Sequence, residues 1–92
     1  MPFEFDPQKS ASNKFKHGID FVEAQALWQS RTVEFDAKDA AAKRYLVIGT
    51  IKGGHWSAII TYRGMKTGLI RVRKSTTQEL ASYTNTARQT NP

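Results

Sequence analysis

Arginine side chains recur in the second half of the chain at positions that could hold a phosphate group. Arg71 and Arg73 alternate with apolar residues, and in a β-strand such residues project from the same face. On this interpretation Leu69 shares their face, whereas Ile70 and Val72 pack inward. The planar guanidinium matches phosphate oxygens, so these side chains could position RNA and stabilise charge that builds on a phosphate. The alternative is that they only solubilise and protect an exposed strand.

Arg63 extends this set on the strand predicted before it. In a strand, Arg63 would share a face with Thr61 and Ile59. Trp56 and Ala58 would lie on the opposite face. The sequence therefore predicts a guanidinium cluster on an open face of a sheet, with an apolar and aromatic face behind it.

Proton carriers are few in this chain. His17 could act as general base or acid on a ribose hydroxyl, with Lys16 beside it, provided that it faces the arginines. Its place at the end of a predicted helix is the structural alternative, and that alternative accounts for the residue completely. Tyr83 could stack on a base or supply a phenolic proton, or could be a partly buried anchor. His55 is interpreted as a loop residue, and two histidines without clustered carboxylates give little support for a metal site.

Length and composition restrict the class of protein. The 92 residues have room for one small domain, and the absence of cysteine excludes disulfides and thiolate catalysis and fits a cytoplasmic protein. No apolar run approaches the ~18 residues of a membrane span, and the acidic start is not typical of a signal peptide. The net charge of +6 arises entirely after residue 50. This asymmetry suggests a polyanion or an acidic protein as partner, with a solvated basic face as the alternative.

Helix signals dominate the first third of the chain. The alternation of residues 3–5 predicts a short strand, and Asp6 followed by Pro7 predicts the start of a helix over 7–17. Gly18 can adopt the left-handed conformation that ends it. The apolar stripe of this helix is expected to contain Ala11, Phe15 and Ile19. A capping box at Asp20 and Glu23 predicts a second, short amphipathic helix that ends at Ser30.

Strand signals follow. Residues 32–35 are interpreted as a strand, and 36–43 are left unassigned. Two apolar runs, 45–51 and 56–62, flank a Gly-Gly turn and predict a hairpin, and a turn at 63–66 leads to a further strand over 68–73. Thr76 and Glu79 predict the start of a last helix that ends near residue 88, with a frayed tail over 89–92. The expected fold is α+β: a short N-terminal strand, two helices, an antiparallel sheet of three to four strands and a C-terminal helix.

Several residue blocks occur in an order that resembles a known family. They are Phe3-Glu4-Phe5-Asp6-Pro7, Lys9, Asn13, Lys16-His17-Gly18, Phe21, Glu23-Ala24, Arg44-Tyr45, Ile48-Gly49, Arg63-Gly64, and Arg73-Lys74 with Thr76, Glu79 and Tyr83. This order resembles the signature of the BrnT family, ribonuclease toxins of type II toxin–antitoxin systems. The resemblance extends over residues 3–83. The Lys-His-Gly block in its N-terminal context is the most specific part.

The resemblance implies a fold similar to the RelE-like toxins and cleavage of RNA without a metal or other cofactor, which arrests translation. It implies a BrnA-type antitoxin partner, which carries a ribbon-helix-helix element and binds operator DNA as a complex with the toxin. Cytoplasmic action, no membrane association and an oligomer with the antitoxin follow from the same comparison. By position, Arg63 and Arg73 correspond to family arginines, and Lys16 and His17 correspond to its Lys-His pair.

These correspondences predict a site in which Arg63 and Arg73 bind phosphate and stabilise the transition state while His17 or Lys16 assists proton transfer. The substrate-binding residues are expected to be Arg71, Lys74, Tyr83 and Arg44. The hypothesis requires the arginines to converge on one concave surface. The chain departs from the family in two places: it has Arg71-Val72-Arg73 where members commonly show Ser-Ala-Arg, and its last helix is neutral rather than basic.

Two other functions remain open at this stage. The scaffold could be a non-catalytic RNA- or protein-binding module, because no unmistakable acid/base pair stands out. Alternatively, the exposed arginines could serve chiefly to dock an acidic segment of an antitoxin.

Overall fold

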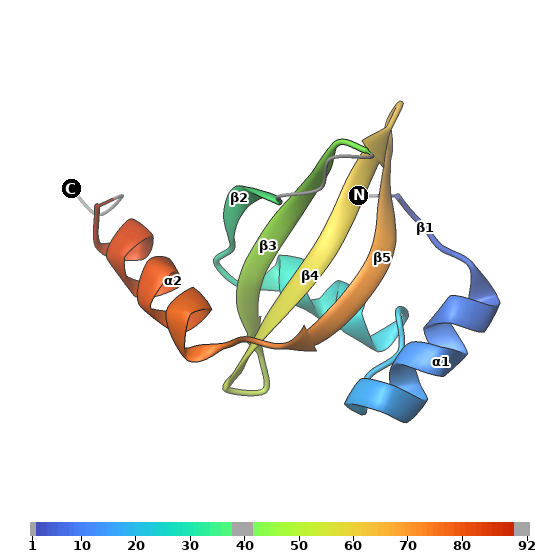
Figure 1. Ribbon diagram of the computed structural model, residues 1–92, viewed down its shortest axis with the longest axis horizontal. Helices are drawn as coiled ribbons and strands as arrows, with labels where there is room; N and C mark the ends of the chain where they lie inside the picture. Colours follow the sequence, from blue (N-terminus) through green and yellow to red (C-terminus); the bar gives the residue numbers. More distant parts are fainter. Residues whose placement is uncertain (1, 38–41, 90–92) are drawn as a thin grey trace.

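Five strands form one mixed sheet in the order β1-β5-β4-β3-β2 (Figure 1). The computed structural model describes residues 2–37 and 42–89. Strands β3 (Arg44–Ile51), β4 (Gly54–Arg63) and β5 (Lys66–Lys74) form the predicted antiparallel meander. The prediction of a purely antiparallel sheet of three to four strands is wrong in two respects. Strand β2 (Val33–Ala37) adds to β3 antiparallel, and β1 (Phe3–Glu4) returns along β5 in parallel.

Three helices surround the sheet: α1 (Pro7–His17), the 3₁₀ helix η1 (Glu23–Gln29) and α2 (Thr77–Gln89). In Figure 1, η1 lies behind the strands, whereas α1 and α2 lie at opposite margins of the sheet. The face of the sheet turned away from η1 is called the open face below. The RelE-like relation implied by the family resemblance stays a prediction.

The predicted bounds of α1 are confirmed together with the local chemistry that sets them. The Asp6 carboxylate accepts a hydrogen bond from the Gln8 amide at 2.8 Å, and Pro7 occupies the first helical position. Gly18 ends the helix at φ 80°, and its amide donates to the Lys14 carbonyl.

The segment after α1 keeps its predicted capping box but forms a 3₁₀ helix rather than an α-helix. Asp20 Oδ1 accepts from the amides of Val22 and Glu23, and Glu23 Oε1 accepts from the Asp20 amide. In a 3₁₀ helix, residues three apart are aligned along the axis. Ala24 and Leu27 therefore both point into the core, where each is fully buried.

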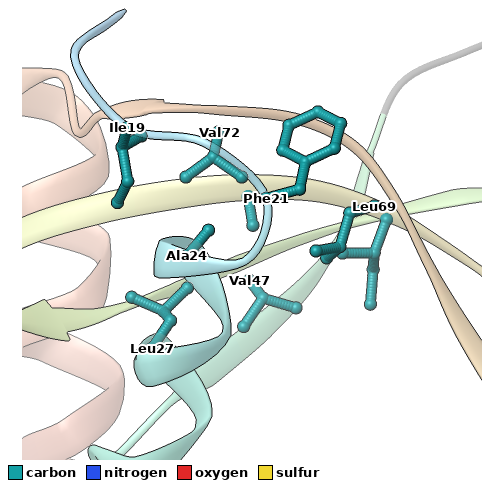
Figure 2. Close-up of a cluster of buried hydrophobic side chains, with 9 residues drawn as sticks. Ile19, Phe21, Ala24, Leu27, Val47, Leu69 and Val72 are labelled. Carbon is teal, nitrogen blue, oxygen red and sulfur yellow. The ribbon is translucent and has the colours of Figure 1, made fainter. Parts of the chain in front are cut away.

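The hydrophobic core lies between η1 and the sheet (Figure 2). Phe21, Ala24 and Leu27 contribute from the η1 side and are completely buried. Burial of this apolar surface is the main favourable contribution to folding. The sheet and the loop before η1 supply the rest: Ile19, Val47, Ala58, Ile60, Leu69 and Val72.

A polar rather than an apolar face joins α1 to the sheet, so the predicted stripe is wrong for Ala11 and Phe15. Ala11 is exposed and Phe15 is 91% exposed. The buried side chains of α1 are Ser10 and Asn13. The helix packs against the edge of β5, where unpaired backbone groups require hydrogen-bond partners that an apolar stripe could not supply.

Asn13 meets this requirement for the backbone groups of one residue of β5, Val72. Its side-chain amide donates to the Val72 carbonyl at 2.8 Å and accepts from the Val72 amide at 3.1 Å. It also donates to the Ile19 carbonyl at 2.8 Å. Strand β1 pairs only with Thr67 and Gly68, so Asn13 continues the ladder along β5 beyond the end of β1.

A β-bulge in β5 corrects the predicted face assignment of Leu69. The pairing jumps from Ile60–Leu69 to Ile59–Arg71, so Ile70 is the extra residue. Leu69 and Val72 therefore both point into the core. Arg71 pairs with Ile59 and Arg73 pairs with Ser57, and both arginines remain on the open face.

The last helix begins at the predicted capping box and extends to Gln89. Residue 89, which was expected to belong to a frayed tail, is therefore helical. The rest of that predicted tail, 90–92, lies outside the described residues. Part of the unassigned connection, 38–41, also lies outside them. None of the helices in the described part of the chain has the length and hydropathy of a membrane span.

We expect Asn13→Ala to lower the free energy of unfolding by about 2 to 4 kcal/mol, because it leaves buried peptide groups of Val72 and Ile19 without partners. Urea unfolding followed by circular dichroism measures this loss. The control is Gln8→Ala, an exposed substitution on the same helix. Equal stability of the two variants would show that Asn13 does not hold α1 on β5.

Candidate functional site

A hollow of about 340 Å³ lies where α1 flanks the open face of the sheet. One wall is the side of α1 that faces β5, and the other is the middle of the sheet. The hydrogen bonds between the Asn13 side chain and the Val72 backbone hold the two walls together. The residues that line the hollow are Lys9, Ser12, Asn13, Lys16, His17, Arg44, Ile70 and Arg71.

The hollow is strongly cationic. Lys9, Lys16 and Arg71 are exposed side chains, and none of them forms an ion pair within residues 2–37 and 42–89. Among residues 2–37 and 42–89, none that lines the hollow is acidic. His17, the last residue of α1, is half-buried at its rim. Lys9, Lys16 and Arg71 therefore line one concave surface without an ion-pair partner in the described part of the chain, and such an arrangement attracts anions.

Four of the predicted site residues thus lie together: Lys16, His17, Arg44 and Arg71. Arg44 reaches the hollow from β3, Arg71 from β5 and the other two from α1.

Arg73 lies beyond this hollow and is bound to Glu79 of α2. Its Nη1 and Nη2 donate to the two carboxylate oxygens at 2.7 and 2.9 Å. Glu79 also accepts from the Ser57 hydroxyl and from the Thr76 amide, both at 2.9 Å. The Arg73 guanidinium, together with these donors, lowers the pKa of the Glu79 carboxyl to about 2. The pair fastens α2 to the open face.

Arg63 lies at the other end of the open face and forms an ion pair with Glu4 of β1 at 3.0 Å. The strand partner of Arg73 is Ser57, six residues before Arg63 on the same strand. At ~3.3 Å per residue the two arginines are roughly 20 Å apart. The prediction that Arg63 and Arg73 converge on one anion is therefore wrong, because the chain places them at opposite ends of β4.

Two predicted substrate-binding residues also lie outside the hollow. Lys74 pairs with Trp56 on the opposite face of the sheet, and its ammonium lies 5.9 Å from the centre of that ring. The Tyr83 hydroxyl donates to the Arg31 carbonyl at 2.9 Å, and its ring packs edge-on against His55. Tyr83 thus anchors α2, as the structural alternative for it predicted.

The chain matches, over residues 5–79, the family described as the BrnT ribonuclease toxin of type II toxin–antitoxin systems. This match spans most of the 92 residues. The chain belongs to the BrnT family. No curated protein matches it. A type II system implies a protein antitoxin as partner, and the family is described as ribonucleases.

The blocks that resemble the BrnT signature have two different places in the structure. Lys16 and His17 line the cationic hollow. Arg73, Thr76 and Glu79 instead meet one another, because Thr76 and Glu79 form a capping box and Glu79 binds Arg73. One block of the BrnT signature therefore supplies the hollow, and the other attaches α2.

Lys9 also lines the hollow, but the sequence analysis named it only within the BrnT resemblance and not as a site residue. Lys9 and Lys16 are seven residues apart and so lie on one face of an α-helix, and this spacing could have identified Lys9. Asn13 was recognised only as part of the BrnT resemblance, and its link to Val72 has no local sequence signal. Across the described residues, no three His, Asp or Glu side chains gather closely enough to hold a metal ion.

The Arg73–Glu79 pair makes the free energy of unfolding depend on pH in the acid range. Because the pKa of Glu79 is about 2 in the fold, against an ordinary value of 4.5, the carboxylate stabilises the fold above pH 4.5. This contribution is lost as the pH falls from about 4.5 toward 2. We expect roughly 1 to 2 kcal/mol after screening by solvent.

Urea unfolding of the wild type and of Glu79→Gln between pH 2 and 7 measures this dependence. The two proteins should differ most at neutral pH and converge at the acid end. A constant difference across the range would contradict the assignment.

Proposed function

We propose that this BrnT protein is an endoribonuclease that holds a phosphate of RNA in the cationic hollow between α1 and the open face. The observation that supports it is the convergence of Lys9, Lys16, His17, Arg44 and Arg71 on one hollow of about 340 Å³, whose described lining residues include no acidic one. A polyanion gains from such a surface, and the family is one of ribonucleases.

The reaction that these groups can perform is transesterification within the RNA. The ribose 2′ oxygen attacks the adjacent phosphorus, the bond from phosphorus to the 5′ oxygen breaks, and a 2′,3′-cyclic phosphate and a 5′-hydroxyl end are formed. His17 takes the proton of the 2′ hydroxyl, and the Lys16 ammonium returns a proton to the departing 5′ oxygen. Arg71 binds the phosphate oxygens through its planar fork and stabilises the negative charge of the transition state.

The arrangement assigns different roles to the predicted arginines. Arg71 and Arg44, expected only to bind substrate, lie where phosphate would be held. Arg73 is given the role of attaching α2, because its two terminal nitrogens, Nη1 and Nη2, are bound to Glu79. Arg63 lies outside the cationic hollow and lines a neighbouring hollow instead.

In the cell, this activity would cleave RNA in the cytoplasm and arrest translation. A BrnA-type antitoxin with a ribbon-helix-helix element would neutralise it and carry the complex to operator DNA.

A non-catalytic RNA-binding role is the second candidate. It is favoured by one observation, that the lining residues in the described part of the chain include no carboxylate that could orient His17. Purified protein that binds RNA with a steep salt dependence and leaves it intact would support this role instead.

Arg71→Ala should lower the rate of RNA cleavage about 100-fold, because it removes the fork that stabilises transition-state charge. His17→Ala should lower it by roughly 100-fold or more through loss of the proton acceptor. The measurement is the appearance of cyclic-phosphate ends on a labelled single-stranded RNA, with growth arrest on expression without antitoxin as the cellular readout.

The matched control is Lys14→Ala, which removes a cation from the same helix but outside the hollow, where Lys14 pairs with Glu23 at 2.7 Å. It should keep its activity. Full activity of the Arg71→Ala and His17→Ala variants would remove both residues from the mechanism.

A further inference from the structure

A second hollow of about 340 Å³ adjoins the cationic one on the open face. The two share Lys9 and Ile70 as lining residues, so a chain bound in the first would pass directly into the second. The second hollow differs in its chemistry. Its lining combines a carboxylate–guanidinium pair, Glu4 and Arg63, with a hydroxyl from Thr61 and the backbone of Gly68.

Gly68 is buried at the base of this hollow, under the side chain of Thr61. A Cβ at this position would lie 2.9 Å from Thr61 Cγ2 and 3.8 Å from Glu4 Cγ, so any other residue would displace the Thr61 side chain. The glycine therefore lets Thr61 and Glu4 keep their places in the lining.

The wall of the hollow is the Glu4–Arg63 pair. Arg63 Nη2 donates to Glu4 Oε1 at 3.0 Å, and this is the one hydrogen bond of the Glu4 carboxylate within residues 2–37 and 42–89. The Arg63 side chain is 78% exposed, so most of its donors are available. Asp6 also lines the hollow, but one of its oxygens is bound to the Gln8 amide at the start of α1.

The pair therefore presents donors from Arg63 beside acceptors from Glu4. The complementary ligand edge carries one acceptor followed by two donors. Among the four RNA bases only guanine has this edge, with O6 as the acceptor and N1–H and the 2-amino group as the donors. Single-stranded RNA exposes such edges, and proteins read them through side chains of this kind.

We propose that the second hollow is a guanine subsite, in which Glu4 accepts from N1–H and the 2-amino group and Arg63 donates to O6. This inference rests on the proposed ribonuclease function and names the base that lies next to the phosphate held in the cationic hollow. Lys9, which lines both hollows, holds the phosphate between them. Glu4 and Arg63 are specificity-determining residues, and the reacting groups stay in the first hollow.

The test uses the intact protein and two readouts. The first is cleavage of single-stranded oligonucleotides that differ only in whether one position is G, A, C or U. We expect cleavage beside G to be favoured roughly 5- to 100-fold. Glu4→Gln and Arg63→Ala should each reduce this preference to less than about threefold while cleavage itself continues.

The matched control is Glu34→Gln, the same chemical change on β2, where Glu34 accepts from the Tyr62 hydroxyl outside both hollows. It should keep the preference for G. Both Glu4 and Arg63 form an ion pair that is partly exposed to solvent, so their variants are expected to fold.

The second readout is binding of the four nucleoside 3′-monophosphates, measured by NMR titration. Guanosine 3′-monophosphate should bind at least about fivefold more tightly than the others, and Glu4→Gln should abolish the difference. This readout separates the two proposals. Preferential binding of the guanosine nucleotide without RNA cleavage would overturn the ribonuclease function but support the subsite. Cleavage without any base preference, or with a preference for G that Glu4→Gln leaves unchanged, would overturn the subsite alone.

Discussion

The side-chain amide of Asn13 takes the place of a strand along the part of β5 that β1 does not reach. It pairs with both backbone groups of Val72 and so fixes the position of α1 against the sheet. On an α-helix, the neighbours of Asn13 on the same face are the residues four before it and three and four after it. These residues are Lys9, Lys16 and His17, and all three line the cationic hollow. The hydrogen bonds that attach the helix therefore also position the proposed catalytic groups.

The β-bulge at Ile70 places Leu69 and Arg71 on opposite faces of β5. In a regular strand, Leu69 and Arg71 would share a face, so burying Leu69 would also bury the arginine. The extra residue turns the strand between them, and Leu69 becomes 3% exposed in the core while Arg71 stays on the open face. Bulges commonly aim a side chain in this way. The hydrophobic core and the cationic hollow can thus share one strand.

Local signals made most of the elements predictable. The caps at Asp6 and Gly18, the Gly-Gly turn and the Thr76–Glu79 box each act within a few residues, and the structure confirms them. The contacts that form the two hollows join residues far apart in the sequence. They are the contacts of Asn13 with Val72 and of Arg63 with Glu4, and the parallel pairing of β1 with β5. Periodicity carries no information about such partners. For this reason the sequence identified most of the cationic side chains of the hollow but also assigned Arg63, Arg73 and Lys74 to it, which lie elsewhere.

A surface that binds a polyanion must leave cations without partners, whereas a stable fold favours paired charges. This chain separates the two requirements along the open face. Arg73 is neutralised by Glu79 at one end and Arg63 by Glu4 at the other, and the unpaired charge is concentrated between them at Arg71, Lys9 and Lys16. The net positive charge of this face is therefore greatest at the hollow, and an anion is attracted there more strongly than at either ion pair. In the proposed function, the carboxylates of Glu4 and Glu79 thus help to determine where an RNA backbone would be held, together with the arginines.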